Sequence, residues 1–167
     1  MSNAEYHSKK DYESSSSIRD ALLNPKKYIF RKTHETVPTK SMEEGTAVHS
    51  YFLENDKFKK NYVFKPKAFN GRTKEGKEWM QEHGHLNILG AEWEENLIQM
   101  NHNFLNSPAK FIYDNEGLAE LSFFWDDIYK IKGKCRPDWL SINGNTVVDL
   151  KTTKDASPKS FQRSISE

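Results

Sequence analysis

The chain has 167 residues, of which 35% are hydrophobic and 13% aromatic, a composition that supports one folded domain and excludes a disordered chain. Its only cysteine, Cys135, excludes an intramolecular disulfide and a cysteine-rich metal site. The formal net charge is +1, and no apolar run approaches the roughly 20 residues of a membrane span or forms the core of a signal peptide. We therefore expect a cytoplasmic protein with no membrane partner.

Helices are predicted for most of the first hundred residues. Capping residues and hydrophobic periodicity predict helices over residues 18–23, after Lys40, over 72–83 and over 93–106. Tyr62–Phe64 is predicted to be a short strand, and Asn70-Gly71 a turn. The helix over 72–83 is expected to turn Trp79 and Met80 inward.

Strands are predicted for the second half of the chain. β-prone runs predict strands over residues 118–125, 129–135, 136–142 and 146–151, with Asp126-Asp127 as the first turn. Successive strands joined by short turns indicate an antiparallel meander. Ser157-Pro158 then begins a last helix, because serine caps a helix and proline suits its first turn. We expect a single α+β domain over residues 1–167.

The charge is distributed unevenly along the chain. Between Lys57 and Lys77 lie eight basic residues and one acid, whereas from Glu78 to Asp127 lie ten acids and one lysine. Aromatic residues interleave with the basic block, as in surfaces that contact a phosphate backbone. The alternative is a lysine-rich loop that merely faces water.

Residues 136–153 carry the most informative pattern. Asn143-Gly144 favours a two-residue type I′ hairpin loop, because both central residues of that turn need positive φ. Counting outward from this loop places Asp138 opposite Asp149, and Arg136 opposite Lys151. Side-chain alternation keeps these four residues on one face of the hairpin.

Two opposed carboxylates repel each other. At 4 Å the repulsion is about 1 kcal/mol in water and about 4 kcal/mol at an effective dielectric constant of 20. A divalent cation between Asp138 and Asp149 would turn this repulsion into ligation, and hard oxygen ligands suit Mg²⁺ or Mn²⁺. The alternative is an exposed hairpin whose acids are offset by Arg136 and Lys151.

The same residues resemble a known nuclease pattern. Asp138 followed by Asp149-Leu150-Lys151 is similar to the Asp…(Asp/Glu)-x-Lys motif of the PD-(D/E)xK nuclease superfamily. The segment Arg136-Pro137-Asp138 resembles the corresponding segment of the RecE-like, or exodeoxyribonuclease VIII-like, branch found in phages and prophages. Further segments recur in the same order in that branch, namely residues 14–28, 45–54, 72–77 and 119–122.

The resemblance implies a fold and an activity. The fold would be a restriction-endonuclease-like core with helices packed on a mixed central sheet, here lacking the C-terminal helices of the family. The activity would be that of a Mg²⁺-dependent exonuclease on linear double-stranded DNA in phage-type recombination, beside a single-strand-annealing recombinase and as a homo-oligomer. Activity of a chain truncated in this way is expected to be weak or absent.

The resemblance also implies a set of site residues. Asp138, Asp149 and the carbonyl of Leu150 would hold Mg²⁺, or Mn²⁺, and Lys151 would stabilise the developing negative charge. His49, in the matching Gly-x-x-x-His helix, and Glu120 would lie at the same metal. Without the resemblance, His49 could equally be a core or surface imidazole, and Glu120 a solvent-facing carboxylate opposite Lys132 or Lys134.

Contacts with DNA are expected from several basic and hydroxyl side chains: Ser17, Arg19, Arg31, Arg72, Lys74, Arg136 and Thr152. Two other classes of function remain open. One is a RecB-like or restriction-type endonuclease of the same fold, and the other is a non-catalytic DNA-binding or scaffold module.

Overall fold

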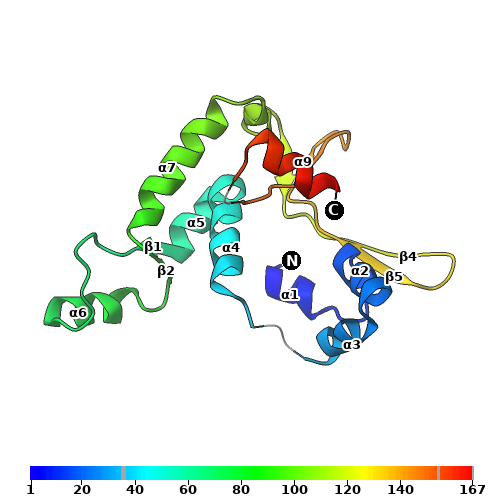
Figure 1. Cartoon of the computed structure of the whole chain (residues 1–167), viewed down its shortest axis with the longest axis horizontal. Coiled ribbons are helices and arrows are strands. Elements are labelled where there is room, and N and C mark those ends of the chain that lie inside the picture. The colour runs from blue at the N-terminus through cyan, green and yellow to red at the C-terminus, as the bar shows by residue number, and fades with distance from the viewer. Residues whose placement is uncertain (35–36, 154, 167) are drawn as a thin grey trace.

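The computed structural model describes residues 1–34, 37–153 and 155–166. Helices α1 (Asn3–Ser8), α2 (Ser15–Leu23) and α3 (Pro25–Thr33) form an N-terminal group beside a two-stranded hairpin, and α4 (Lys40–Leu53) lies at the centre of the molecule (Figure 1). No helix in the described ranges combines the length and the apolar character that a membrane span requires.

Local capping explains the first helices. Ser14 accepts a hydrogen bond from the Ser17 amide at the start of α2, and Asn24 caps α3, whose first residue is Pro25. The predicted helix over residues 18–23 and its end at Asn24-Pro25 are therefore confirmed, with a start three residues earlier. The two helices are joined by Asp20, which pairs with Lys27 at 3.0 Å and with Arg31.

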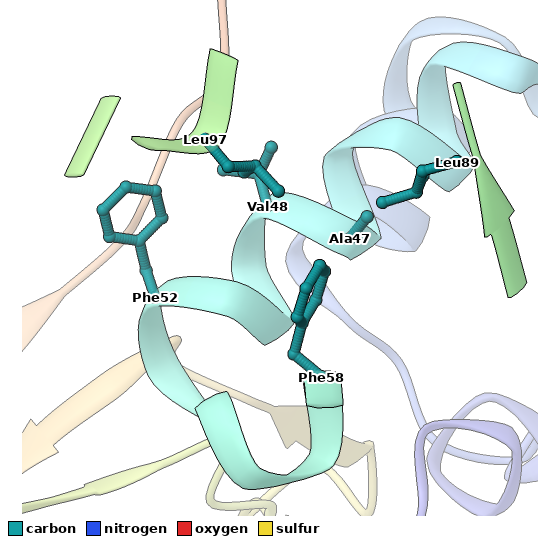
Figure 2. Packing of buried hydrophobic residues seen from close by; sticks show 6 residues of the cluster. All are labelled: Ala47, Val48, Phe52, Phe58, Leu89 and Leu97. Carbon is teal, nitrogen blue, oxygen red and sulfur yellow. The ribbon is translucent and has the colours of Figure 1, made fainter. Parts of the chain in front are cut away.

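The main core forms where α4 meets its neighbours. Ala47, Val48 and Phe52 of α4 are buried against α5 (Asn55–Asn61), β2 (Asn87–Leu89) and α7 (Glu92–Leu105). Figure 2 shows the side chains that close this cluster around α4, which include Phe58, Leu89 and Leu97. The predicted strand β1 (Tyr62–Phe64) pairs in parallel with β2 at the edge of the core.

The predicted helix over residues 72–83 is confirmed as α6 (Lys74–His83), which stands away from the rest of the molecule (Figure 1). Of the two residues expected to turn inward, Trp79 does so and Met80 does not. Trp79 is half-buried and stacks on His83 with ring centroids 4.5 Å apart, but Met80 is 38% exposed. The expectation for Met80 was wrong because α6 contacts little besides its own connecting loop.

The predicted helix over 93–106 is α7, and it ends before Ser107 as expected. A short 3₁₀ turn over Pro108–Lys110 and α8 (Phe111–Asp114) follow it. The last helix begins at Pro158, as predicted, and forms α9 (Pro158–Ser166). The final residue, Glu167, lies outside the described residues.

The strands within the described residues form three small sheets. β3 (Gly117–Ala119), β6 (Trp139–Ser141) and β7 (Val147–Val148) form an antiparallel sheet in the order β3-β6-β7. β4 (Phe123–Asp126) and β5 (Lys132–Cys135) form a separate hairpin, which projects outward in Figure 1. The mixed central sheet is therefore not formed by the described strands, since the parallel β1-β2 pair is separate.

The meander prediction was wrong at one point. The strand predicted over 118–125 breaks after Ala119, and Glu120 takes a left-handed φ of 54°. The break separates two stretches of one antiparallel pairing, β3 with β6 and β4 with β5, which keep the same register; β6 therefore pairs with β3 and not with β5. Such a break cannot be read from β-propensity, because the residues on both sides of it favour strands.

The hairpin register is confirmed, but its loop is not the predicted one. Trp139 pairs with Val148 and Leu140 with Val147, in the frame that sets Asp138 opposite Asp149. The loop spans residues 142–145, because the Ser141 amide donates to the Thr146 carbonyl at 2.9 Å. Of the two central residues expected in a type I′ turn, Gly144 has positive φ, at 71°, and Asn143 does not.

The longer loop has a local cause. The Asn143 side chain accepts hydrogen bonds from the Ser141 hydroxyl at 2.7 Å and from the Asn145 amide at 3.0 Å. These bonds stabilise a wider turn in place of the two-residue loop. Because the loop gains one residue on each side, the strand register is unchanged.

Leu97 provides a test of the core. Leu97→Ala should lower the free energy of unfolding by about 2–5 kcal/mol, because this side chain is 1% exposed and its loss leaves a cavity. Its neighbour Ile98 is 60% exposed, so Ile98→Ala should change stability by about 0.5 kcal/mol or less. Urea unfolding followed by circular dichroism measures both. Equal losses in the two variants would contradict this description of the core.

Candidate metal centre

Three potential ligands from separate segments meet at one point. His49 lies on α4, Glu120 follows β3 and Asp138 precedes β6. His49 Nδ1 is 3.6 Å from Asp138 Oδ1 and 4.0 Å from Glu120 Oε1. The candidate ligand atoms of all three residues lie within 4.8 Å of one another. The structure thus brings together three of the residues that the sequence analysis singled out.

The sheet register explains why the carboxylates are adjacent. The Glu120 amide donates to the Asp138 carbonyl at 3.0 Å, which continues the β3-β6 pairing by one residue. The β6-β7 register places Asp149 opposite Asp138 on the other side. By register, Glu120, Asp138 and Asp149 form a row of neighbouring backbone positions across the sheet. The ligand atoms of Glu120 and Asp138 meet in the cluster, and the Asp149 side chain lies outside it. The alternative that sets Glu120 opposite Lys132 or Lys134 does not hold.

His49 reaches this row from the helix above it. Burial of Ala47 and Val48 in the core fixes the orientation of α4. The helical repeat then places His49, the next residue, at the edge of the buried face. The Glu120 carboxylate, 4.0 Å from Nδ1, raises the pKa of His49. The Asp138 carboxylate raises this pKa further, whereas burial of the imidazole lowers it. His49 therefore holds its proton more strongly beside the two carboxylates.

Asp138 is the most enclosed of the three, with a side chain 13% exposed. Burial raises the pKa of its carboxyl, and the charges of Asp149 and Glu120 raise it further. The Leu150 amide donates to Asp138 Oδ2 and, together with His49, opposes that rise. Because burial and the neighbouring carboxylates disfavour the ionised form of Asp138, a bound cation would stabilise that form.

The Asp149-Leu150-Lys151 segment alternates between core and solvent. Leu150 packs against the α4 cluster, whereas Asp149 and Lys151 face outward with side chains 59% and 76% exposed. Their charged groups pair with each other, Lys151 Nζ lying 2.6 Å from Asp149 Oδ2. Asp149 is thus next to the three-residue cluster but not inside it, and Lys151 lies beside it.

The donor set fits a hard divalent cation. Two ligands of an octahedral Mg²⁺ at about 2.1 Å lie about 3.0 Å apart when adjacent and about 4.2 Å apart when opposite. The distances of 3.6 and 4.0 Å between His49 and the two carboxylates are of this size. Carboxylate and carbonyl oxygens suit Mg²⁺ or Mn²⁺, whereas an imidazole ligand suits transition metals better than Mg²⁺. Asp149 and the Leu150 carbonyl are the neighbouring groups that could complete such a site.

The expected DNA-contact residues fall into two groups. Arg19, Arg72 and Thr152 are exposed, and Lys74 pairs only loosely with Glu78, at 3.9 Å. Thr152 lies against α4, since a methyl group placed on Gly45 would be 3.6 Å from its hydroxyl. The remaining three residues are engaged within the protein: Ser17 in the α2 cap, Arg31 with Asp20, and Arg136 with Glu120.

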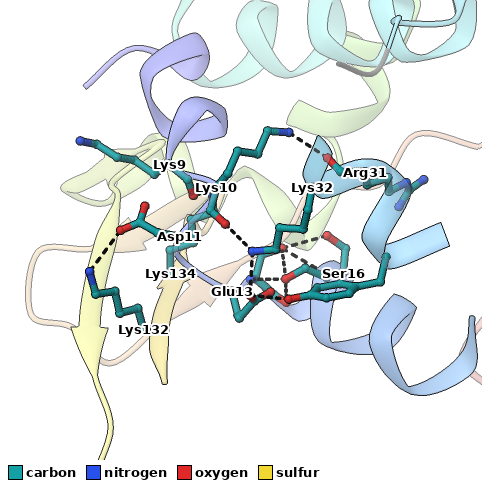
Figure 3. A network of polar contacts seen from close by, with 12 residues as sticks. Lys9, Lys10, Asp11, Glu13, Ser16, Arg31, Lys32, Lys132 and Lys134 are labelled. Atoms are coloured by element: carbon teal, nitrogen blue, oxygen red, sulfur yellow. Dashed lines mark hydrogen bonds and ion pairs between the residues drawn. The ribbon is translucent and has the colours of Figure 1, made fainter. Parts of the chain in front are cut away.

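The N-terminal segment carries a polar network that the sequence analysis missed. Lys134 is buried, and its ammonium donates to the carbonyls of Tyr6 at 2.9 Å and Lys9 at 2.7 Å. Glu13 accepts from Lys32 and from the Tyr28 hydroxyl in the same network (Figure 3). No sequence signal could have identified it, because its members are brought together from both ends of the chain.

A large concave surface adjoins this network. A cavity of 1710 Å³ lies between the N-terminal helices and the β1-β2 region, and lysines from several elements line it: Lys10, Lys32, Lys40, Lys65, Lys67 and Lys134. Ser17 and Arg31 line it too, whereas the three clustered metal-ligand candidates do not. The basic surface and the carboxylate row are therefore separate features of the molecule.

Comparison with known proteins agrees with this arrangement. Residues 14–167 match the family described as a PDDEXK-like domain of unknown function (DUF3799). None of the curated proteins compared with the chain matches it. The match covers nearly the whole chain, including the helix of His49 and the strands around Asp138 and Asp149, and the chain therefore belongs to this family of PDDEXK-like domains.

Proposed function

We propose that this protein is a divalent-metal-dependent deoxyribonuclease. The observation that carries the proposal is the row of Glu120, Asp138 and Asp149 with His49 above it, within a domain of the PDDEXK-like family. Mg²⁺ is the proposed cation and Mn²⁺ the alternative. Its ligands would be His49, Glu120, Asp138, Asp149 and the Leu150 carbonyl.

The residues of this site have distinct roles in the proposal. A bound divalent cation would supply Lewis-acid activation of water and neutralise charge on the scissile phosphate. Lys151 places an exposed ammonium at the edge of the site, where it stabilises negative charge that develops on the phosphate. Asp149 pairs with Lys151 and so restrains that ammonium.

The proposed substrate is linear double-stranded DNA, degraded from an end as in phage-type recombination. The resemblance to RecE-like exonucleases supports this assignment, together with a partner of the single-strand-annealing type and a homo-oligomeric state. The basic block between Lys57 and Lys77 supports contact with a phosphate backbone, because clustered positive charge attracts nucleic acid independently of its sequence. Ser17, Arg19, Arg31, Arg72, Lys74 and Thr152 remain the proposed DNA contacts.

Metal binding can be measured directly. Titration of Mn²⁺ into the protein by calorimetry should give one site, and Asp138→Asn should weaken it by more than about tenfold, since even changes outside the ligand set cost that much. Asp114→Asn on α8 is the matched control, because it removes the same charge from a side chain that is 59% exposed. Equal affinity in the Asp138 and Asp114 variants would show that the cluster is not the metal site.

Cleavage tests the two residues beside the cluster. With Mg²⁺ and a linear duplex, Asp149→Asn should abolish cleavage, and Lys151→Met should lower kcat by about 10²–10³-fold through loss of charge stabilisation. Both residues are more than half exposed, so thermal midpoints should stay near that of the unmodified protein. Full activity of Asp149→Asn at saturating Mg²⁺ would reject its assigned role.

The form of the DNA distinguishes the classes of function. An exonuclease digests linear duplex and leaves closed-circular duplex intact, because it needs an end. Cutting of closed circles would instead identify a RecB-like or restriction-type endonuclease. Binding without cleavage of either form would identify a non-catalytic module and overturn the proposal.

A further inference from the structure

Arg136 is buried beside the metal-ligand candidates rather than displayed to solvent. Its side chain is 8% exposed, although it directly precedes the Pro137-Asp138 segment at the surface of the sheet. Arg136 Nε donates to the Glu120 carbonyl at 3.0 Å and lies 3.6 Å from the Glu120 carboxylate. One guanidinium therefore holds both the backbone and the side chain of Glu120.

The Glu120 backbone needs such support. Its φ of 54° is a left-handed conformation that residues with a side chain adopt rarely and at an energetic cost. The conformation interrupts the strand at the residue whose amide donates to the Asp138 carbonyl. The carbonyl bonded by Arg136 belongs to this strained residue, so the bond stabilises the conformation that places the carboxylate.

The other side of the guanidinium is fixed by the first residues of the chain. Arg136 donates through its terminal nitrogens to the Asn3 side chain at 3.1 Å and to the Met1 carbonyl at 2.7 Å. The buried Tyr6 ring of α1 stacks on the guanidinium, with its centroid 5.0 Å away. Each of the three guanidinium nitrogens thus donates one hydrogen bond inside the protein, which uses three of the five N–H groups and ties the fork to the fold.

We propose that Arg136 is a positioning residue, which holds Glu120 against His49 and Asp138 and so tunes the affinity of the metal site. The proposal rests on the metal site described under the proposed function. It replaces the expected DNA contact of Arg136 with a role inside the protein. Groups that orient metal ligands in this way commonly affect metal affinity by about 10–100-fold.

Charge and position predict opposite outcomes at this residue. If Arg136 acted only through its positive charge, Arg136→Met would remove a repulsion and tighten binding of a cation. If it positions Glu120, Arg136→Met weakens Mn²⁺ binding by about tenfold or more. Arg136→Lys keeps the charge and one donor but not the planar fork, so it should recover only part of the loss.

The experiment measures Mn²⁺ affinity by calorimetry for the whole chain and these variants, at equal folded fraction by circular dichroism. Lys132→Met is the matched control, because Lys132 also joins the N-terminal segment to β5, at 3.2 Å from Asp11, without contacting Glu120. It should leave the affinity within about twofold. Should Arg136→Met not fold, the comparison of Arg136→Lys with the unmodified chain carries the test.

A double variant separates positioning from general loosening. If Arg136 acts through Glu120, Arg136→Met should have little further effect in a Glu120→Gln background, because their interaction is already lost. Unchanged or tighter binding in Arg136→Met, or full additivity with Glu120→Gln, would overturn the positioning role. If neither Arg136→Met nor Asp138→Asn changes the Mn²⁺ affinity, the proposed metal site is wrong. If Asp138→Asn weakens Mn²⁺ binding and Arg136→Met does not, the metal site stands and only the positioning role of Arg136 is rejected.

Discussion

The position of Leu150 is the constraint on which the rest of the site depends. Its side chain packs against the α4 core, and its amide donates to the Asp138 carboxylate. The same residue thus attaches the last strand to the core and orients the Asp138 carboxylate. Because the strand alternates, burial of Leu150 also turns Asp149 and Lys151 toward solvent beside the cluster.

Basic residues accompany the carboxylate row. Arg136 contacts Glu120 at one end, His49 lies over Glu120 and Asp138, and Lys151 pairs with Asp149 at the other end. Removal of Arg136 or Lys151 leaves an acidic neighbour without its compensating charge. A divalent cation fits the same arrangement, since it would offset the repulsion among the carboxylates.

The register of one long antiparallel pairing makes Glu120 the neighbour of Asp138. β3 and β4 pair with β6 and β5 in a single register, in which Ala119 lies opposite Trp139 and Phe123 opposite Cys135. The left-handed Glu120 interrupts the strand between β3 and β4 without shifting this register. The Glu120 amide accordingly donates to the Asp138 carbonyl. The N-terminal helix α1 contributes to this outcome from a distance, through Met1, Asn3 and Tyr6 on Arg136.

The sequence by itself determined the features that depend on local physical chemistry. The caps at Ser14 and Asn24, the helices that end before Ser107 and begin at Pro158, and the register that sets Asp138 opposite Asp149 follow from neighbouring residues and side-chain alternation. The tertiary structure alone decided the left-handed Glu120, the inward turn of Arg136 and the approach of His49 to the carboxylates. These features depend on contacts between residues distant in the chain, whose energies no local pattern of hydrophobicity or charge records.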